Sequence, residues 1–182
     1  ILICRPLPKC AYGFGKGRGV VENARLHARY KYTLTLDIKD FFPSVHFTRV
    51  EELFSNLGAI PEVARALTCL TTFEHALPQG APTSPYLAGL VLGVLDQRFV
   101  SLCAKNRLTY SRYFDDITIS GSKRAHEILP LAQEIITTTG FQVHTGPDKL
   151  CLYSPSDVRL ITGIEIQNGS LRVPYAPDLK AY

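Results

Sequence analysis

The sequence contains neither methionine nor tryptophan, and its five cysteines form no C-x-x-C pair. An odd number of cysteines without paired spacing argues against a disulfide framework and against a zinc site. Most of them are therefore expected to be small buried side chains. Because the chain opens at Ile1 without an initiator methionine, we expect it to be a fragment of a longer protein.

Long hydrophobic runs are also missing. The longest apolar stretch, Tyr86–Leu95, is too short to span a bilayer and leads directly into Asp96. No signal-peptide pattern of charged start, apolar middle and small-residue cleavage site is present. We therefore expect a cytoplasmic protein without a membrane partner. At 182 residues and 46% hydrophobic composition, the chain is long enough for one globular domain with a core.

Positive charge is concentrated near the start of the chain. Seven basic residues and one acid lie between Arg5 and Lys31, a local charge of +6 (7 − 1) against +4 for the whole chain. The glycine-rich stretch "AYGFGKGRGVVENARLH" fits neither a dinucleotide fingerprint nor a P-loop, so it predicts a flexible basic loop. Lys16 and Arg18 in this loop are predicted to bind nucleic acid. A solvated basic surface explains the charge about equally well.

Hydrophobic periodicity predicts interleaved helices and strands. Helices are expected over 47–57, 61–72, 84 to about 105, and 124–139, the last kinked or restarted at Pro130. Strands are expected over 30–38, on both sides of residues 114–116, and in the last 40 residues, where Asn168-Gly169 is a strong hairpin-turn signal. This pattern predicts an α+β domain with a sheet backed by helices.

The stretch "YSRYFDDITISG" (110–121) places two adjacent aspartates between strand-forming runs, with Phe114–Asp116 expected at the hairpin tip. Neighbouring carboxylates in a partly buried place repel, and a multiply charged cation would remove that difficulty. Asp37, at the end of another strand, could oppose them if the two strands are neighbours. Hard oxygen donors without nearby His or Cys favour Mg²⁺ or Mn²⁺, and two such ions suit in-line phosphoryl transfer. For an isolated aspartate pair, a polar turn is the ordinary alternative.

Four stretches of the sequence resemble motifs of reverse transcriptases. They follow one another in the order found in that family, and the match covers nearly the whole chain. "YFDD" resembles their Y-x-D-D box, "LTLDIKDFFPSV" their first palm motif, "LPQGAPTSP" the L-P-Q-G-x-x-x-S-P loop of the bacterial branch, and "TGFQVHTGPDKL" the motif that follows. "NARLH" (Asn23–His27) and "LITG" (Leu160–Gly163) are similar to two elements of retron-type enzymes. Phe114 stands where those enzymes usually carry Ala, and Ile161 stands where they carry Val.

The resemblance implies a polymerase palm-type antiparallel sheet backed by helices, with a partial fingers segment. Residues 1–31 would end the fingers, 32–173 would form the palm with a helical insertion at 46–76 adjoining the fingers, and 174–182 would begin the connection to a thumb. It also implies two Mg²⁺ ions, with Mn²⁺ as a substitute. Their predicted ligands are the catalytic side chains and one backbone carbonyl: Asp37, Asp115, Asp116 and, through its carbonyl, Ile38.

Further roles follow from the resemblance. Phe42 would be a gate against a 2′-hydroxyl, although the sequence alone cannot decide between that role and a place in the core. Gln79 and Gly80 would contact the incoming nucleotide, unless they form an ordinary turn that caps the long helix. Lys149 would donate a proton to the pyrophosphate or neutralise it, unless it is a solvated lysine after a turn. Arg112 would meet template or primer phosphate, unless it is a surface strand arginine. The retron-like elements contribute Asn23, His27, Thr162 and Gly163, with His27 expected to make a structural hydrogen bond within its element.

The resemblance implies an RNA-directed DNA polymerase that adds dNTPs to a primer on a structured noncoding RNA. Its partners would be that RNA, the DNA product and an effector protein, in anti-phage defence. Group II intron-like, CRISPR-associated and diversity-generating reverse transcriptases keep the same chemistry and remain alternatives. A non-catalytic RNA- or protein-binding scaffold and a metal-dependent nuclease are alternatives of other classes.

Overall fold

The protein is described by a computed structural model that covers residues 6–14, 17–122, 125–146 and 148–174. Lys16, Arg124 and most of the expected connection at 174–182 lie outside the described residues. The helices are α1 (Val20–His27), α2 (Phe41–Ser44), α3 (Phe47–Asn56), α4 (Pro61–Thr71), α5 (Ser84–Val91), α6 (Gly93–Asn106), the 3₁₀ helix η2 (Ala125–Ile128) and α7 (Leu129–Thr138). The strands are β1 (Ala11–Tyr12), β2 (Tyr32–Asp37), β3 (Thr109–Tyr113), β4 (Asp116–Gly121), β5 (Leu150–Tyr153), β6 (Arg159–Ile161), β7 (Ile164–Gln167) and β8 (Ser170–Arg172).

The main sheet has five strands in the order β1-β3-β4-β2-β5. All neighbours are antiparallel except β1, which pairs in parallel with β3. The predicted antiparallel sheet is therefore mixed at one edge, and part of the segment expected to be a flexible loop forms this edge strand. Two contacts hold it: the Arg112 backbone N–H donates to the Cys10 carbonyl at 3.0 Å, and the Arg18 side chain donates to the Ala11 carbonyl at 3.2 Å.

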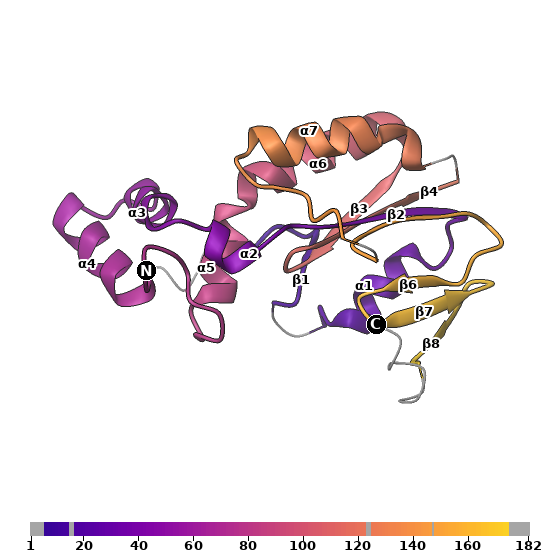
Figure 1. The fold of residues 1–182 in the computed structure, drawn as a ribbon, viewed down its shortest axis with the longest axis horizontal. Helices are drawn as coiled ribbons and strands as arrows, with labels where there is room; N and C mark the ends of the chain where they lie inside the picture. Colours follow the sequence, from indigo (N-terminus) through magenta and orange to yellow (C-terminus); the bar gives the residue numbers. More distant parts are fainter. Residues whose placement is uncertain (1–5, 15–16, 123–124, 147, 175–182) are drawn as a thin grey trace.

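The two faces of the sheet are covered by different layers. Figure 1 shows α6 and α7 on one side of the sheet, and α1 with the small sheet β6-β7-β8 on the other. Side chains alternate along a strand, and Leu34, Leu36, Ile117 and Ile119 are fully buried in the core cluster that also includes side chains of α6 and α7. Burial of one such side chain contributes about 1.5–3 kcal/mol. The opposite face, with Asp37 and Asp116, is left for the site described below.

The long helix expected from Ser84 to about Lys105 is broken into α5 and α6, which meet at 52°. Leu92 and Gly93 lie at the break, and glycine is a weak helix former at which helices bend. The last long helix restarts as predicted, with η2 followed by α7 and Pro130 in its first turn. Among the described residues no single helix is long and apolar enough to cross a membrane, and only the bent α5–α6 pair passes on length and composition.

The late strands form a meander with two tight turns. Asn168 and Gly169 have φ values of +50° and +80° between β7 and β8, which confirms the predicted hairpin turn. Thr162 and Gly163 repeat this geometry between β6 and β7, with φ values of +46° and +79°. Positive φ at both central residues is the type I′ arrangement that matches the twist of paired strands. The retron-like "LITG" element is therefore one strand end followed by a hairpin turn.

Candidate active site

Asp37 and Asp116 lie directly opposite each other on the neighbouring strands β2 and β4. Side chains of such a cross-strand pair project from the same face of the sheet. Asp37 is 6% exposed and Asp116 is partly buried. The sequence had required these strands to be neighbours for the acids to act together, and the register fulfils that condition.

The turn between β3 and β4 consists of Phe114 and Asp115. Tyr113 pairs with Asp116, so Asp116 is the first residue of β4 and not part of the tip, which corrects the predicted tip by one residue. Phe114 has a φ of +52°, a strained conformation for a bulky side chain that costs about 1–3 kcal/mol. Its ring packs edge-on against Phe14, with 4.9 Å between centroids. It also covers Gly13, where a Cβ would lie 2.9 Å from the ring.

Burial and mutual repulsion perturb the two adjacent acids. The pKa of Asp116 is raised from 3.8 to about 7, first by burial and then by the charges of Asp115 and Asp37. The pKa of Asp115 is also raised, chiefly by burial, with a further contribution from Asp37. Both carboxyl groups thus resist ionisation together until positive charge arrives. Such perturbed clusters are typical of functional sites.

Lys149 brings a positive charge to these acids. Its Nζ donates to Asp37 Oδ2 at 2.8 Å, and this hydrogen bond is the main reason that the pKa of Lys149 is raised. The side chain is 46% exposed, so the ammonium group reaches the site from solvent. The backbone N–H of His144 donates to the Asp37 carbonyl at 2.8 Å. This bond ties the segment before β5 to the end of β2.

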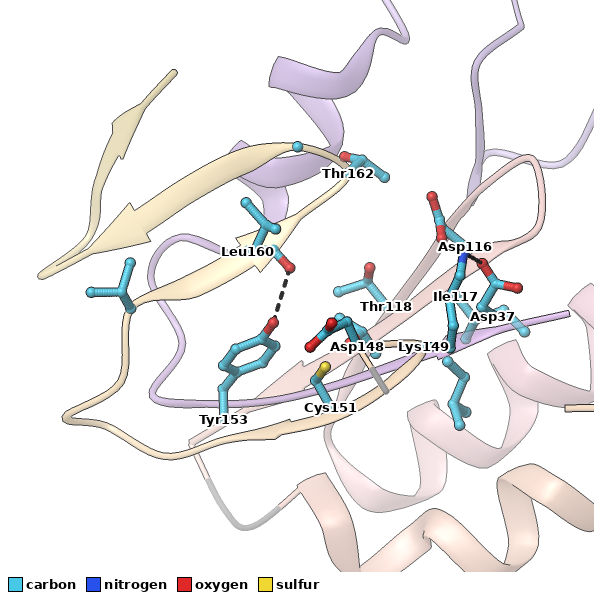
Figure 2. A pocket seen from close by; sticks show the side chains of 14 residues that line it. Asp37, Asp116, Ile117, Thr118, Asp148, Lys149, Cys151, Tyr153, Leu160 and Thr162 are labelled. Atoms are coloured by element: carbon cyan, nitrogen blue, oxygen red, sulfur yellow. Dashed lines mark hydrogen bonds and ion pairs between the residues drawn. The ribbon is translucent and has the colours of Figure 1, made fainter. Parts of the chain in front are cut away.

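A cavity of about 390 Å³ opens beside Asp37, Asp116 and Lys149. Figure 2 shows Lys149 reaching Asp37 at one end, and Thr118, Cys151 and Tyr153 extending along the sheet toward Leu160 and Thr162 of the small sheet. The cavity is therefore bounded by the acids on one side and by the retron-like turn on the other.

The donor set fits a divalent cation. Carboxylate oxygens are the ligands that Mg²⁺ prefers, and burial together with the neighbouring acids raises the pKa values of Asp115 and Asp116. Within the described part of the chain no three acidic, histidine or cysteine side chains already form a ready-made metal cage. Lys149 occupies one oxygen of Asp37 instead. Lys149 would therefore compete with an ion for that oxygen.

Arg112 is not available to nucleic acid, so its predicted phosphate contact is wrong. The side chain is fully buried, and its guanidinium forms a two-pronged ion pair with Asp96 of α6 at 2.8 and 2.9 Å. Tyr110 donates to the same carboxylate at 2.8 Å. The sheet is covered on both faces here, so strand alternation does not leave Arg112 exposed.

Asn23 and His27, from the "NARLH" element on α1, form a buried network that reaches β3 and β4. Ser111 Oγ donates to Asn23 Oδ1 at 2.5 Å and lies 2.7 Å from His27 Nε2. Ser120 Oγ lies 2.5 Å from His27 Nδ1. Because the Ser111 proton is committed to Asn23, His27 donates from Nε2 and accepts at Nδ1 as a neutral imidazole. Burial lowers the pKa of His27 to about 3, which agrees with that form.

The hydrogen bond expected for His27 within its own element is wrong, because its ring nitrogens pair with Ser111 of β3 and Ser120 of β4. Asn23 Nδ2 also donates to Thr162 Oγ1 at 3.4 Å, so the two retron-like elements meet. Gly163 completes the turn at Thr162. These four family-element residues therefore join α1, the main sheet and the small sheet.

The predicted nucleotide contacts lie in two other segments. Phe41 is buried in the core, whereas Phe42 is half-buried on α2 with its ring 5.1 Å from that of Phe41. Gln79 and Gly80 are exposed in the loop before α5, where Gly80 has a φ of +90° that favours glycine. These three residues do not line the cavity beside Asp37. Their contact with a nucleotide stays a prediction.

The basic loop gives a mixed result. Lys16 lies outside the described residues. Arg18 is half-buried, and its Nη1 donates to the Pro8 carbonyl at 2.9 Å as well as to Ala11. At least part of the Arg18 side chain therefore stabilises the edge strand, and its contact with nucleic acid stays a prediction.

Sequence reasoning missed several buried polar residues that join the elements of the fold. Asp96 carried a usable signal, because it is an acid at the end of the most apolar stretch of the chain. Ser111 and Ser120 are ordinary in strands and gave none. Arg159 is 5% exposed and donates to the carbonyls of His27 and Ala28 and to Thr33, which fixes the small sheet against α1 and β2.

Comparison with known proteins agrees with this geometry. Residues 2–166 match the family described as reverse transcriptase (RNA-dependent DNA polymerase). The retron Ec86 reverse transcriptase of Escherichia coli is 33% identical over 156 residues, which cover 85% of this chain and 48% of that protein. The retron Mx65 reverse transcriptase of Myxococcus xanthus is 34% identical over 181 residues, covering 88% of this chain and 42% of that protein. The chain thus spans about half the length of the curated relatives it matches.

Solved structures agree on the fold. Telomerase from Candida albicans, in complex with a fragment of telomeric RNA, matches with a TM-score of 0.61 at 10% identity, over 79% of this chain and 31% of that chain. At this identity the likeness shows the palm-type fold alone. The family match and the retron relatives show, beyond the fold, which family the chain belongs to. The chain belongs to the reverse transcriptase (RNA-dependent DNA polymerase) family, in its retron-type bacterial branch.

Proposed function

We propose that the full-length protein is an RNA-directed DNA polymerase whose active centre lies in this chain. The observation that carries the proposal is the placement of Asp37 opposite Asp116, with Asp115 in the adjoining turn and Lys149 bonded to Asp37. Residues 1–31 would end the fingers and 32–173 would form the palm, with the insertion at 46–76 adjoining the fingers.

Asp37, Asp115 and Asp116, with the Ile38 carbonyl, would hold two divalent ions, Mg²⁺ or Mn²⁺. Such ions supply positive charge to the attacking and leaving oxygens of an in-line phosphoryl transfer. In that transfer the primer 3′-oxygen forms a bond to the α-phosphorus of a dNTP, and the bond from phosphorus to pyrophosphate breaks. The raised pKa values of Asp115 and Asp116 support this proposal, because they mark a site built for added positive charge.

Lys149 would act on the leaving group. Its ammonium is half-exposed and lies at the mouth of the cavity that Asp37 lines. Once released from Asp37, it can donate a proton to the departing pyrophosphate or neutralise its charge. Phe42 would exclude a 2′-hydroxyl and so favour dNTPs, while Gln79 and Gly80 would contact the incoming nucleotide.

The template would be a structured noncoding RNA that also supplies the primer, as expected for a retron-type enzyme. The retron relatives support this choice, since every relative described above is a retron reverse transcriptase. Lys16 and Arg18 would add basic contacts to the RNA. A role in anti-phage defence with an effector protein is a finer part of this proposal. The retron relatives favour it over the group II intron-like, CRISPR-associated and diversity-generating alternatives.

Primer extension by the full-length protein on an RNA template with dNTPs and Mg²⁺ tests the proposal. Wild type is expected to make DNA, and Asp115→Asn and Asp116→Asn are expected to lose synthesis while keeping the fold. Asp157→Asn is the matched control, because Asp157 is exposed in the turn after β5. If wild type binds RNA tightly yet makes no DNA, the scaffold function replaces the polymerase.

A further inference from the structure

The turn that carries Asp115 is held by one buried arginine on the helix side of the sheet. Arg112 Nη1 donates to the Phe114 carbonyl at 3.1 Å, and Nη2 donates to the Gly89 carbonyl of α5 at 3.0 Å. The remaining bonds go to both oxygens of Asp96. A single guanidinium therefore joins α5, α6 and the turn, and its side chain has no exposed surface.

The bond to Phe114 acts directly on the peptide that leads into Asp115. The carbonyl of Phe114 belongs to the Phe114–Asp115 peptide unit, which is planar. Fixing this oxygen fixes the plane of that unit, and with it the direction in which Asp115 leaves the turn. Phe114 has a φ of +52°, so the turn needs such a restraint to stay in its strained conformation.

We propose that Arg112, held by Asp96, is a positioning residue that sets the orientation of the aspartate turn for catalysis. The proposal rests on the proposed function, because it assigns the restraint to the placement of Asp115 and Asp116. A buried ion pair is weak support for stability alone, since apolar residues of similar volume often replace one without loss. What apolar residues cannot replace is the planar fork that reaches Asp96, Gly89 and Phe114 together.

Arg112→Lys in the full-length protein is the first test. Lysine keeps the charge and can still pair with Asp96, but one ammonium cannot serve three acceptors in the geometry of the fork. Amide hydrogen exchange in the metal-free protein is expected to speed up in the segment 110–121. The Kd for Mn²⁺, measured by calorimetry, is expected to rise about 10- to 100-fold, with a similar fall in kcat. The KM for dNTP is expected to stay nearly constant.

Arg159→Lys is the matched control. Arg159 is also a buried arginine with several backbone acceptors, but it lies beside Thr33, at the opposite end of β2 from Asp37. This variant is expected to lower the melting temperature without changing exchange in 110–121, Mn²⁺ affinity or kcat. A purely structural role for Arg112 would make the two variants behave alike.

A second variant covers the case in which Arg112→Lys fails to fold. Tyr110→Phe, Asp96→Leu and Arg112→Met together replace the polar cluster by apolar side chains, so that no buried charge is left unpaired. A folded triple variant with fast exchange at the turn and low kcat supports the proposal. Wild-type exchange and kcat in either variant, or loss of the fold in both, overturns it. A wild-type protein that neither binds Mn²⁺ nor makes DNA refutes the proposed function instead, and the exchange result still decides what Arg112 does.

Discussion

Replacing Asp116 by Asn is expected to stabilise the metal-free protein at neutral and alkaline pH. The pKa of Asp116 rises from 3.8 to about 7 on folding, first because of burial and then because of Asp115 and Asp37. Between these values the folded state holds a proton that the unfolded state has lost. The contribution of Asp116 to stability is therefore greatest below pH 4 and is lost as the pH rises toward about 7, where the folded carboxyl ionises.

The magnitude follows from the same linkage. The interval from 3.8 to about 7 corresponds to about 4 kcal/mol at 1.36 kcal/mol per pKa unit. This value is the largest increase in unfolding free energy expected for Asp116→Asn at pH 8, and the increase falls to zero below pH 4. Asparagine has the same shape as aspartate, and its amide can donate to Asp37, so little packing is lost. The substitution is expected to raise stability and abolish catalysis, a trade-off that is common when a buried active-site acid is replaced.

Unfolding of wild type and Asp116→Asn is to be followed from pH 4 to pH 8 in the presence of a chelator. The difference in unfolding free energy should grow with pH and level off above about pH 7. Asp157→Asn, at an exposed turn, serves as the control and should show no such growth. Mg²⁺ should then raise the melting temperature of wild type and not that of Asp116→Asn. A difference that is flat across the range, or a less stable variant at pH 8, would refute the electrostatic reasoning.

Two further predictions concern the surroundings of the site. Gly13→Ala should lower the free energy of unfolding by about 1–3 kcal/mol, because its φ is +88° and its Cβ would lie 2.9 Å from the Phe114 ring. Adding Phe114→Ala should recover the steric part, and a double-mutant cycle in urea measures it. His27 has a folded pKa of about 3 against 6.5, so its contribution to stability should fall by about 2 kcal/mol between pH 7 and pH 5 as the unfolded state gains a proton. His27→Gln should lack this fall, and equal slopes in both proteins would contradict the neutral, buried imidazole.

The sequence predicted an element well where a few adjacent residues determine it. The end of β2 at Asp37, the restart at Pro130 and the Asn168-Gly169 turn each follow from a few adjacent residues. The pairing of Asp37 with Asp116 does not, because register between strands 79 positions apart (116 − 37) depends on the whole sheet. The sequence alone identified the acids as candidates, whereas their placement in one site was predicted only from the resemblance to reverse transcriptases.

Burial was harder to predict than structure. Arg112 was expected to meet a phosphate or to lie on the surface of a strand, but its side chain is fully buried because both faces of the sheet are covered. Its partner Asp96 lies on another element, so no short pattern joins the two. The break between α5 and α6 was missed for a related reason: Gly93 weakens a helix only slightly, and packing decides whether the helix bends there.

The two buried polar networks explain how the sheet keeps an unfavourable site in place. Ser111 and Arg112 are adjacent on β3 and point to opposite faces, so the strand is bonded to α1 on one side and to α6 on the other. In the part of the chain that the structure describes, no buried side-chain nitrogen or oxygen lacks a hydrogen bond. Satisfied networks of this kind restrict a strand to one position. The repulsion among Asp37, Asp115 and Asp116 therefore cannot relax by moving the hairpin, and it stays available to attract a cation.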